Sequence, residues 1–503
     1  MWEPVLSLSH VSDTPLFLQI AHAVTDAIQA GQLRSGERLP GSRSLARQLG
    51  VHRNTVLTAY AELEAQGWLC TEQARGTFVS GDIPDRAHQE AVAATQAWSL
   101  STPPQQQAGF TLPHRRPLWA PEAIPHGMLT LLGGRPDLQQ APVKELSRAY
   151  RRAIRRADRT VLDYGDPRGW PALRSALANM LRARRGLAAD AETLLVTRGS
   201  QMALYLVGQV LIRPGDVVAV EELGYRPAWS AFQLAGAQLE PIPVDHEGIQ
   251  VDRLAERVQR GDIRAVYVTP HHQYPTLAVL SAGRRLQLLE LARTHRFAII
   301  EDDYDHEFHF EGRPILPLAS ADRSGVVIYI GSLSKVLAPG PRIGYVVAPQ
   351  EVLTMLAEMR RCIDRQGDFA IEAAVAELIQ EGELQRHIRR MHRIYQHRRD
   401  LLIEALDRHL PGTLRHQRPP GGMALWVEVL GGHDTDAWAS LARTTQRVLF
   451  APGSQFTFDR RPRPYLRLGF ARLQKDVLDE AVRRMAEALH HLSSSHPVAP
   501  SPL

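Results

Sequence analysis

Cysteine is almost absent from this chain of 503 residues, since only Cys70 and Cys362 occur and they lie far apart. Two distant cysteines exclude a disulfide framework and leave a zinc site without the ligands it needs. No apolar run reaches the roughly 18 residues of a membrane-spanning helix. The first ten residues also lack the basic and then apolar pattern of a signal peptide. We therefore expect a cytoplasmic protein with no membrane partner.

Lysine is equally scarce, because Lys144, Lys335 and Lys475 are the only three in the chain. The formal net charge is nevertheless +5 and the isoelectric point about 9.3, which favours a nucleic-acid partner. Between residues 10 and 80 the arginines and acids cancel, so an argument for DNA binding there depends on where the charges lie. A chain of this length predicts two or three cores.

The pattern of apolar residues predicts four regions. Residues 10–80 form a small domain, and residues 81–123, rich in proline and glutamine without an apolar period, form a linker. In residues 124–490 apolar strands alternate with amphipathic helices, which is typical of a mostly parallel α/β sheet. Residues 491–503 form a disordered tail. The candidate strands are Leu194–Thr197, Val217–Val220, Ala265–Thr269, Ala298–Glu301, Val326–Ile330 and Gly344–Ala348.

The small domain has the pattern of a winged helix-turn-helix. We predict helices at Ser42–Leu49 and His52–Gln66, joined by a turn, and two short strands around Gly76. The predicted core consists of Leu45, Ala46, Leu49, Val51, Val56, Leu57, Tyr60 and Leu63. This pattern resembles the GntR-type winged helix, whose second helix enters the major groove of DNA. The candidate DNA-binding residues are His52, Arg53, Asn54 and Thr55 on that helix, with Arg43, Arg47 and Arg75 beside it.

The larger region contains the groups that a pyridoxal-phosphate (PLP) site needs. The cofactor requires a lysine amine for a Schiff base, a carboxylate for its pyridine nitrogen, a partner for its ring hydroxyl and a phosphate cup. Lys335 follows one predicted strand, and Asp302 and Tyr304 follow another, at the edge where ligands of open α/β sheets bind. Gly199-Ser200-Gln201 begins an apolar helix whose free amides favour a phosphate. Further candidates are Ser332, Ser334 and Arg342 beside the phosphate, and Tyr225, which would stack on the ring.

The order of these segments resembles that of fold-type-I aminotransferases, and their fusion to a winged helix resembles the MocR/GabR family of transcriptional regulators. The matching motifs are Tyr164–Gly169, Thr269–Thr276, Glu301–Phe308 and Tyr465–Ala471. The resemblance implies a large, mostly parallel α/β domain, a small C-terminal α/β subdomain and a head-to-tail homodimer. It also implies roles for four residues: Lys335 as the Schiff-base lysine, Asp302 on the pyridine nitrogen, Tyr304 on the ring hydroxyl and Arg467 as a bidentate grip on an effector carboxylate.

Two functions remain open at this point. In the first, the domain senses an amino-containing effector, or PLP itself, and changes how the protein binds an operator. In the second, it is a working aminotransferase with an accessory DNA-binding domain. Sensing is favoured by Tyr274, which stands where enzymes of this fold commonly have an Asn that bonds the ring hydroxyl. The chain also departs from the family's own pattern, with Leu277 in place of Gly, which puts the shape of the nearby loop in question, and Leu223 in place of a frequent Pro. We expect the protein to bind the cofactor but to influence the electronic properties of its ring less strongly, with at most weak transaminase activity.

Two basic segments and a group of histidines have competing interpretations. Arg148–Arg159 and Arg386–Arg399 are either solvated helix faces or auxiliary contacts with DNA phosphates. His271, His272, His306 and His309 invite a metal interpretation. No carboxylate cluster at helical spacing accompanies them, so the sequence predicts loop residues and no metal.

Overall fold

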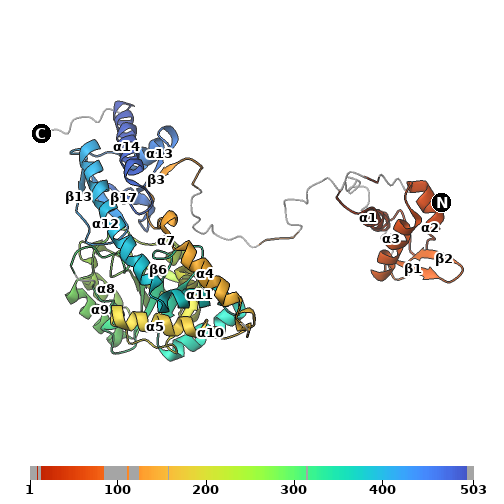
Figure 1. Cartoon of the computed structure of the whole chain (residues 1–503), viewed down its shortest axis with the longest axis horizontal. Helices are drawn as coiled ribbons and strands as arrows, with labels where there is room; N and C mark the ends of the chain where they lie inside the picture. The colour runs from red at the N-terminus through yellow and green to blue at the C-terminus, as the bar shows by residue number, and fades with distance from the viewer. Residues whose placement is uncertain are drawn as a thin grey trace. The chain divides into compact units, whose positions relative to one another are not determined.

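The computed structural model describes residues 8–9, 13–83, 110–112, 124–156, 158–312 and 315–495. The chain divides into two compact units, Met1–Arg115 and Arg116–Leu503 (Figure 1). Most of the predicted linker 81–123 lies outside the described residues, as do residues 496–503 of the predicted tail. None of the helices in the described ranges is long and apolar enough to cross a membrane.

The first unit is the predicted winged helix-turn-helix. It consists of α1 (Leu16–Gln29), α2 (Ser42–Leu49), α3 (Arg53–Ala65) and an antiparallel hairpin of β1 (Leu69–Glu72) and β2 (Gly76–Val79). The prediction that Leu57 belongs to the core is wrong, because this residue is 41% exposed. The buried face of α3 carries Val56, Ala59, Tyr60 and Leu63, the i, i+3, i+4, i+7 pattern, and Leu57 falls beside it.

A seven-stranded sheet organises the described part of the second unit. Its strands, in spatial order, are β4 (Leu194–Thr197), β12 (Gly344–Val347), β11 (Val327–Ser332), β10 (Ala298–Asp303), β9 (Ile263–Val268), β5 (Val217–Glu221) and β6 (Gln238–Ile242). All neighbours are parallel except β12, which runs antiparallel to β4 and β11. The sequence predicted six of these strands and missed β6. Proline and charge interrupt the apolar pattern of β6, which an edge strand tolerates.

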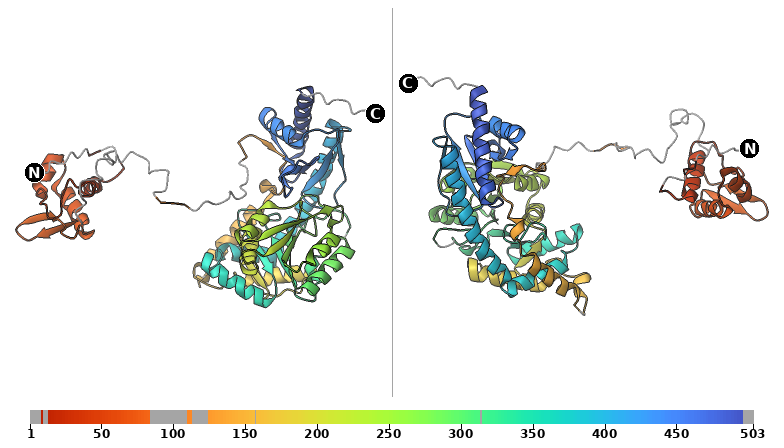
Figure 2. Two further views of the ribbon diagram at one scale, coloured as in Figure 1. Left: turned by 180° about the vertical axis from the view of Figure 1, so that it is seen from behind. Right: turned by 45° about the horizontal axis from the view of Figure 1, so that its top comes forward.

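Helices cover both faces of this sheet (Figure 2). In β5, Val218 and Val220 join one core cluster, whereas Val217 and Ala219 join another, as the period of two in a strand requires. The first cluster includes α6 (Ser200–Leu211), α7 (Arg226–Leu234) and α10 (Gln350–Ile363). The second includes α8 (Val251–Val258) and α9 (Ala282–His295). Other helices of the unit are α4 (Val143–Ile154), α5 (Pro171–Arg185) and α11 (Phe369–Gln380).

A smaller antiparallel sheet with three helices forms the predicted C-terminal subdomain. The sheet has the order β13 (Leu414–His416), β14 (Ala424–Val429), β17 (Tyr465–Gly469) and β16 (Ala451–Pro452). The helices are α12 (Glu383–His409), α13 (Thr435–Thr445) and α14 (Lys475–Ser495) (Figure 1). Two short pairs complete the strands: β3 (Leu129–Thr130) with β15 (Val448–Leu449), and β7 (Val244–Asp245) with β8 (Gly248–Ile249). Single 3-10 turns lie at Leu138–Gln140, Thr160–Leu162, Leu318–Ser320 and Gly453–Gln455.

The predicted tail begins too early, because α14 continues through the first residues assigned to it. The helix reaches Ser495, whereas the sequence predicted disorder from residue 491. Leu478, Val482, Met485 and Leu489 are buried at helical spacing, so packing on the subdomain supports this last helix.

The basic segment Arg148–Arg159 does not form one continuous helical stripe. Helix α4 ends at Ile154, so the last arginines of the segment lie beyond it. Arg152 pairs with Glu377 of α11 and lies 3.6 Å from Glu381. These pairs neutralise part of the charge, which weakens the hypothesis of a contact with DNA.

The basic segment Arg386–Arg399 ends in the protein core rather than on a solvated face. Arg398 is 7% exposed and lies 2.8 Å from Asp137, and Arg399 is 1% exposed and lies 2.9 Å from Glu311. A buried arginine needs such a partner because the desolvation of its charge is costly. These two arginines therefore hold α12 in place, and both interpretations offered for them are wrong.

Candidate functional site

Lys335 lies just beyond the C-terminal end of β11, at the edge of the large sheet where its parallel strands end. Its Nζ donates a hydrogen bond to the carbonyl of Gly134. Burial, with a smaller contribution from the positive charge of Arg467, lowers the pKa of Lys335 to about 8. A lysine in this state loses its proton readily and becomes a nucleophilic amine.

Asp302 lies at the same edge, on the neighbouring parallel strand β10. Its Oδ2 accepts a hydrogen bond from the Tyr267 hydroxyl at 2.9 Å, and its Oδ1 has no partner within the described ranges. Burial raises the pKa of Asp302 to about 7. A buried carboxylate oxygen without a partner fits the protonated nitrogen of a pyridine ring. The sequence missed Tyr267, although a lone tyrosine in an apolar strand was the available signal.

The predicted phosphate seat has the expected backbone geometry. Helix α6 begins at Ser200, and Gly199 precedes it with φ +78°. A Cβ at Gly199 would come within 2.5 Å of Arg342 Nη2, so glycine lets the guanidinium approach this helix end. Arg342 donates to the carbonyl of Arg198 at 2.8 Å. The free amides of a helix N-terminus beside an arginine fit a phosphate.

Ser332 ends β11 and pairs with Gly344 of β12, which in turn pairs with Thr197, two residues before Gly199. The Ser334 amide donates to Ser332 Oγ at 3.1 Å, which fixes the turn that presents Lys335. The structure therefore brings together the predicted Schiff-base lysine, the carboxylate and the phosphate-binding residues at one edge of the sheet.

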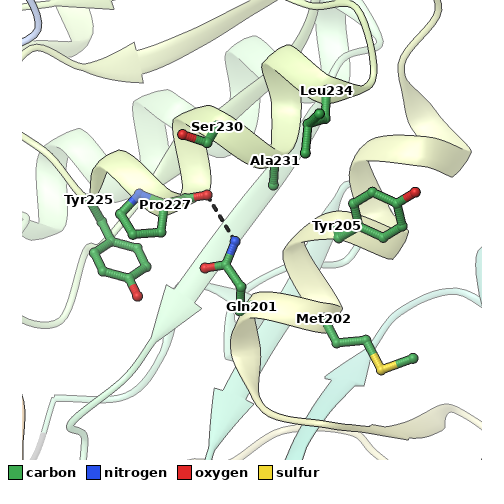
Figure 3. Close-up of a pocket in the computed structure, with 8 residues that line it drawn as sticks. All are labelled: Gln201, Met202, Tyr205, Tyr225, Pro227, Ser230, Ala231 and Leu234. Atoms are coloured by element: carbon green, nitrogen blue, oxygen red, sulfur yellow. Dashed lines mark hydrogen bonds between the residues drawn. The ribbon is translucent and has the colours of Figure 1, made fainter. Parts of the chain in front are cut away.

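Gln201 and Tyr225 line a cavity of about 530 Å³ between α6 and α7 (Figure 3). Gln201 donates through Nε2 to the carbonyl of Pro227 at 3.0 Å, and its Oε1 has no partner in the part of the chain described. Its side chain therefore joins two helices, and its backbone amide lies at the helix N-terminus that would hold a phosphate. Tyr225 lies edge-on to Tyr274, with ring centroids 5.5 Å apart.

Arg467 enters the site from β17 of the smaller subdomain. It is 2% exposed, and its Nε has no hydrogen-bond partner among the described residues. A Cβ at Gly133 would overlap its guanidinium, so glycine makes room for it. The adjacent Gly134 accepts the hydrogen bond of Lys335. The sequence missed this glycine pair, which lies beside both cations.

Tyr304 is close to the site but already has a partner. Its hydroxyl donates to the carbonyl of His272 at 3.0 Å, and its ring lies edge-on to Tyr274 at 5.9 Å. A role on a cofactor hydroxyl remains a prediction for this residue.

Leu277 adopts the left-handed backbone that the family's glycine would favour. Its φ is +66°, and it is 4% exposed. The loop therefore keeps this backbone shape without glycine, at an energetic cost of order 1 kcal/mol or more. The Tyr274-Pro275 peptide in the same loop is cis.

The DNA-binding candidates all belong to the first unit, on α2, at the start of α3 and on the hairpin. Arg43 and Arg47 on α2 are exposed, as are His52, Arg53 and Asn54 at the start of α3, whereas Thr55 is half-buried. His52 caps α3 by accepting from the Asn54 amide through Nδ1 at 3.2 Å, and Arg53 donates to Ser42 at 3.3 Å. Arg75 is exposed on the hairpin, paired with Glu72.

Comparison with known families agrees with both units. Residues 16–79 match the family "Bacterial regulatory proteins, gntR family", and residues 129–485 match "Aminotransferase class I and II". The probable rhizopine catabolism regulatory protein MocR of Rhizobium meliloti is 33% identical over 98% of this chain and 97% of its own length. The HTH-type transcriptional regulator TauR of Rhodobacter capsulatus is 32% identical over 94% of this chain and 96% of its own.

This chain belongs to the MocR family. It is a DNA-binding transcriptional regulator with a fold-type-I aminotransferase domain, as the sequence predicted.

The solved structures extend this result to the cofactor. LysN, the α-aminoadipate aminotransferase of Thermus thermophilus, crystallised with N-(5'-phosphopyridoxyl)-L-leucine, matches with a TM-score of 0.68 and 31% identity. The match covers 74% of this chain and 94% of LysN. Together with the match to the aminotransferase class I and II family, this likeness implies PLP as the cofactor, and Lys335, Asp302 and the N-terminus of α6 fit it chemically.

Proposed function

We propose that this MocR-family regulator senses an amino-containing carboxylate at the PLP site and that the ligand changes its binding to an operator. The observation that carries the proposal is Arg467, a buried cation whose Nε lacks a partner in the described ranges. Leaving such a charge unpaired is costly, so the site favours an anion. A carboxylate offers the two oxygens that match the guanidinium fork.

The amine of the ligand would meet Lys335. PLP, when bound, supplies an aldehyde carbon that captures amines reversibly. Lys335 would hold this carbon when no ligand is bound. As a free amine it has a pKa of about 8, which would let it take up or release a proton near neutral pH. Asp302 would hold the ring nitrogen, and the start of α6 with Arg342 would hold the phosphate. A ligand that contacts Lys335 and Arg467 joins the large and small subdomains.

The operator would be read by α3. Arg53 and Asn54 are exposed at its N-terminus, where side chains reach guanine and adenine edges in the major groove. Arg43, Arg47 and Arg75 would contact phosphates. We propose a head-to-tail homodimer acting in the cytoplasm, because sites of this fold form between subunits and paired readers match paired half-sites.

The test is to measure binding of the full chain to its own upstream DNA while amino acids and carboxylate-free amines are added. We expect an amino carboxylate to change the affinity, and the Arg467→Lys variant to need a concentration about tenfold or more higher, since lysine lacks the bidentate fork. Arg472→Lys, an exposed arginine nearby, is the matched control. Equal responses to amines with and without a carboxylate would contradict the proposal. A response to PLP alone would make the cofactor the signal.

A second function, slow transamination, is favoured by the state of Lys335. A buried lysine with a pKa of about 8 can move protons as a general base. Repeated conversion of an amino acid and a keto acid by the purified protein would establish this activity. A single turnover without a second would leave sensing as the function of the domain.

A further inference from the structure

A cluster of histidines lies beside the cofactor site. The proposed function does not use these side chains. His271 and His272 follow β9, and His309 follows β10. One ring nitrogen from each lies within 4.8 Å of the others. The sequence predicted loop residues and no metal, because no carboxylate cluster at helical spacing accompanies the histidines. The structure instead assembles the cluster from two loops that meet at the edge of the sheet.

The ring nitrogens of this cluster lack the partners that buried polar atoms normally have. Both nitrogens of His271, Nε2 of His272 and Nδ1 of His309 have no hydrogen-bond partner among the residues described. The exposed fractions of the three residues are 2%, 1% and 9%. An unpaired polar group in the interior is destabilising, so the site would gain from a ligand that accepts several nitrogen lone pairs.

His272 is oriented as a metal-ligating histidine is. Its Nδ1 lies 2.8 Å from Asp305 Oδ1 in a buried hydrogen bond, which leaves Nε2 as the free nitrogen. A carboxylate on the far nitrogen fixes the tautomer and raises the basicity of the coordinating one. A Cβ at Gly421 would come within 2.4 Å of this Nε2, so glycine keeps the space beside it open.

Carboxylates beside the cluster favour a cationic ligand. Asp305 supplies negative charge on one side. On the other side, His306 stacks on His271 with ring centroids 4.4 Å apart, and its Nδ1 lies 3.0 Å from Asp303.

We propose that His271, His272 and His309 bind a divalent first-row transition-metal cation, with zinc as the reference ion. Three imidazoles with water as a fourth ligand are a known zinc arrangement. Ligand nitrogens around a tetrahedral ion with bonds of about 2.0–2.1 Å lie roughly 3.3 Å apart, so small ring rotations complete the set. Asp305 also acts on Lys335 electrostatically, so the metal would lie close to the cofactor site.

The test is titration of the PLP-loaded full chain, without a histidine tag, with Zn²⁺ and with Co²⁺. We expect one equivalent per chain, and Co²⁺ absorption bands of the intensity typical of a four-coordinate site. The His309→Gln variant should bind at least about tenfold more weakly. Asp305→Asn should weaken binding about 10–100-fold, the range for loss of a carboxylate partner.

Two control variants separate this site from adventitious binding by the other histidines. His246→Gln changes an exposed histidine, and a double change of His490 and His491 to glutamine removes an adjacent pair. The proposal fails if no stoichiometric binding occurs, if His309→Gln binds as wild type, or if only the control variants lose binding. Should His309→Gln lose its circular dichroism signal, the wild-type Co²⁺ spectrum decides, and weak six-coordinate bands would overturn the proposal.

Discussion

The guanidinium carbon of Arg467 lies 4.6 Å from the centroid of the Tyr274 ring. A cation over an aromatic face is attracted by the ring's electrons. Tyr274 therefore stabilises the position of Arg467, and it stands where the sequence resemblance places an asparagine in enzymes of this fold. The residue that departs from the enzyme pattern supports the residue that we assign to the ligand carboxylate.

This contact predicts a graded effect of substitutions at Tyr274. Tyr274→Phe keeps the aromatic face, so effector affinity should change less than about threefold. Tyr274→Leu removes an attraction of about 0.5–2 kcal/mol and should weaken binding of a carboxylate effector several-fold. Titration of the effector-induced change in absorbance measures both. Equal losses in the two variants would show that the hydroxyl, and not the ring face, matters.

The charge of Arg467 also predicts a shift in the pH dependence of Lys335. Lys335 must lose its proton before it can attack PLP, so the rate of cofactor uptake by the PLP-free protein should rise with pH, with a midpoint near pH 8, and level off above it. A positive neighbour lowers a lysine pKa, so Arg467→Met should raise it and move the profile to higher pH. Stopped-flow absorbance measures the rate. The Arg472→Met variant should keep the wild-type profile, and a common shift in both variants would contradict the account.

The hydroxyl of Tyr267 predicts an effect on cofactor affinity. It donates to Asp302, and a hydrogen bond to a charged group contributes about 1.5–3 kcal/mol. Tyr267→Phe should therefore raise the dissociation constant of PLP by about tenfold or more without unfolding the protein. Tyr205→Phe, on the rim of the nearby cavity, is the matched control. An unchanged dissociation constant in Tyr267→Phe would remove this tyrosine from the site.

The arrangement of arginines on the first unit predicts two kinds of DNA-binding variant. Arg53→Ala should weaken binding to the operator by about 1–3 kcal/mol and relax its sequence preference, because it removes a base contact. Arg47→Ala should weaken binding to all sequences alike and reduce the salt slope by about one, because it removes a phosphate contact. Affinity measured on specific and random DNA at several salt concentrations separates the two. Loss of preference in Arg47→Ala alone would reverse the roles.

The strands, and the candidate cofactor-binding residues at their ends, could be predicted from the sequence because they depend on local patterns. Apolar runs such as Leu194–Thr197 predict a strand wherever they lie, and Asp302 and Lys335 follow directly from the ends of two such runs. Since parallel neighbours end at the same edge, the strand order brings the two residues together.

The features that sequence did not predict depend on packing between distant segments. The salt bridge of Arg398 with Asp137 and the histidine cluster join residues from different elements. The spacing of these residues along the sequence does not predict that they are in contact. The exposure of Leu57 likewise depends on which face of α3 meets α1 and α2, which a single apolar residue does not specify.

The most direct test of the central claim records cofactor absorbance and DNA binding in the same titration. The wild-type protein should show the visible band of PLP joined to a lysine. An amino carboxylate should shift that band and change DNA affinity over the same concentration range. Lys335→Ala should lack the band and should bind DNA without a matching response to that ligand. A DNA response that persists unchanged in Lys335→Ala would contradict sensing through the cofactor.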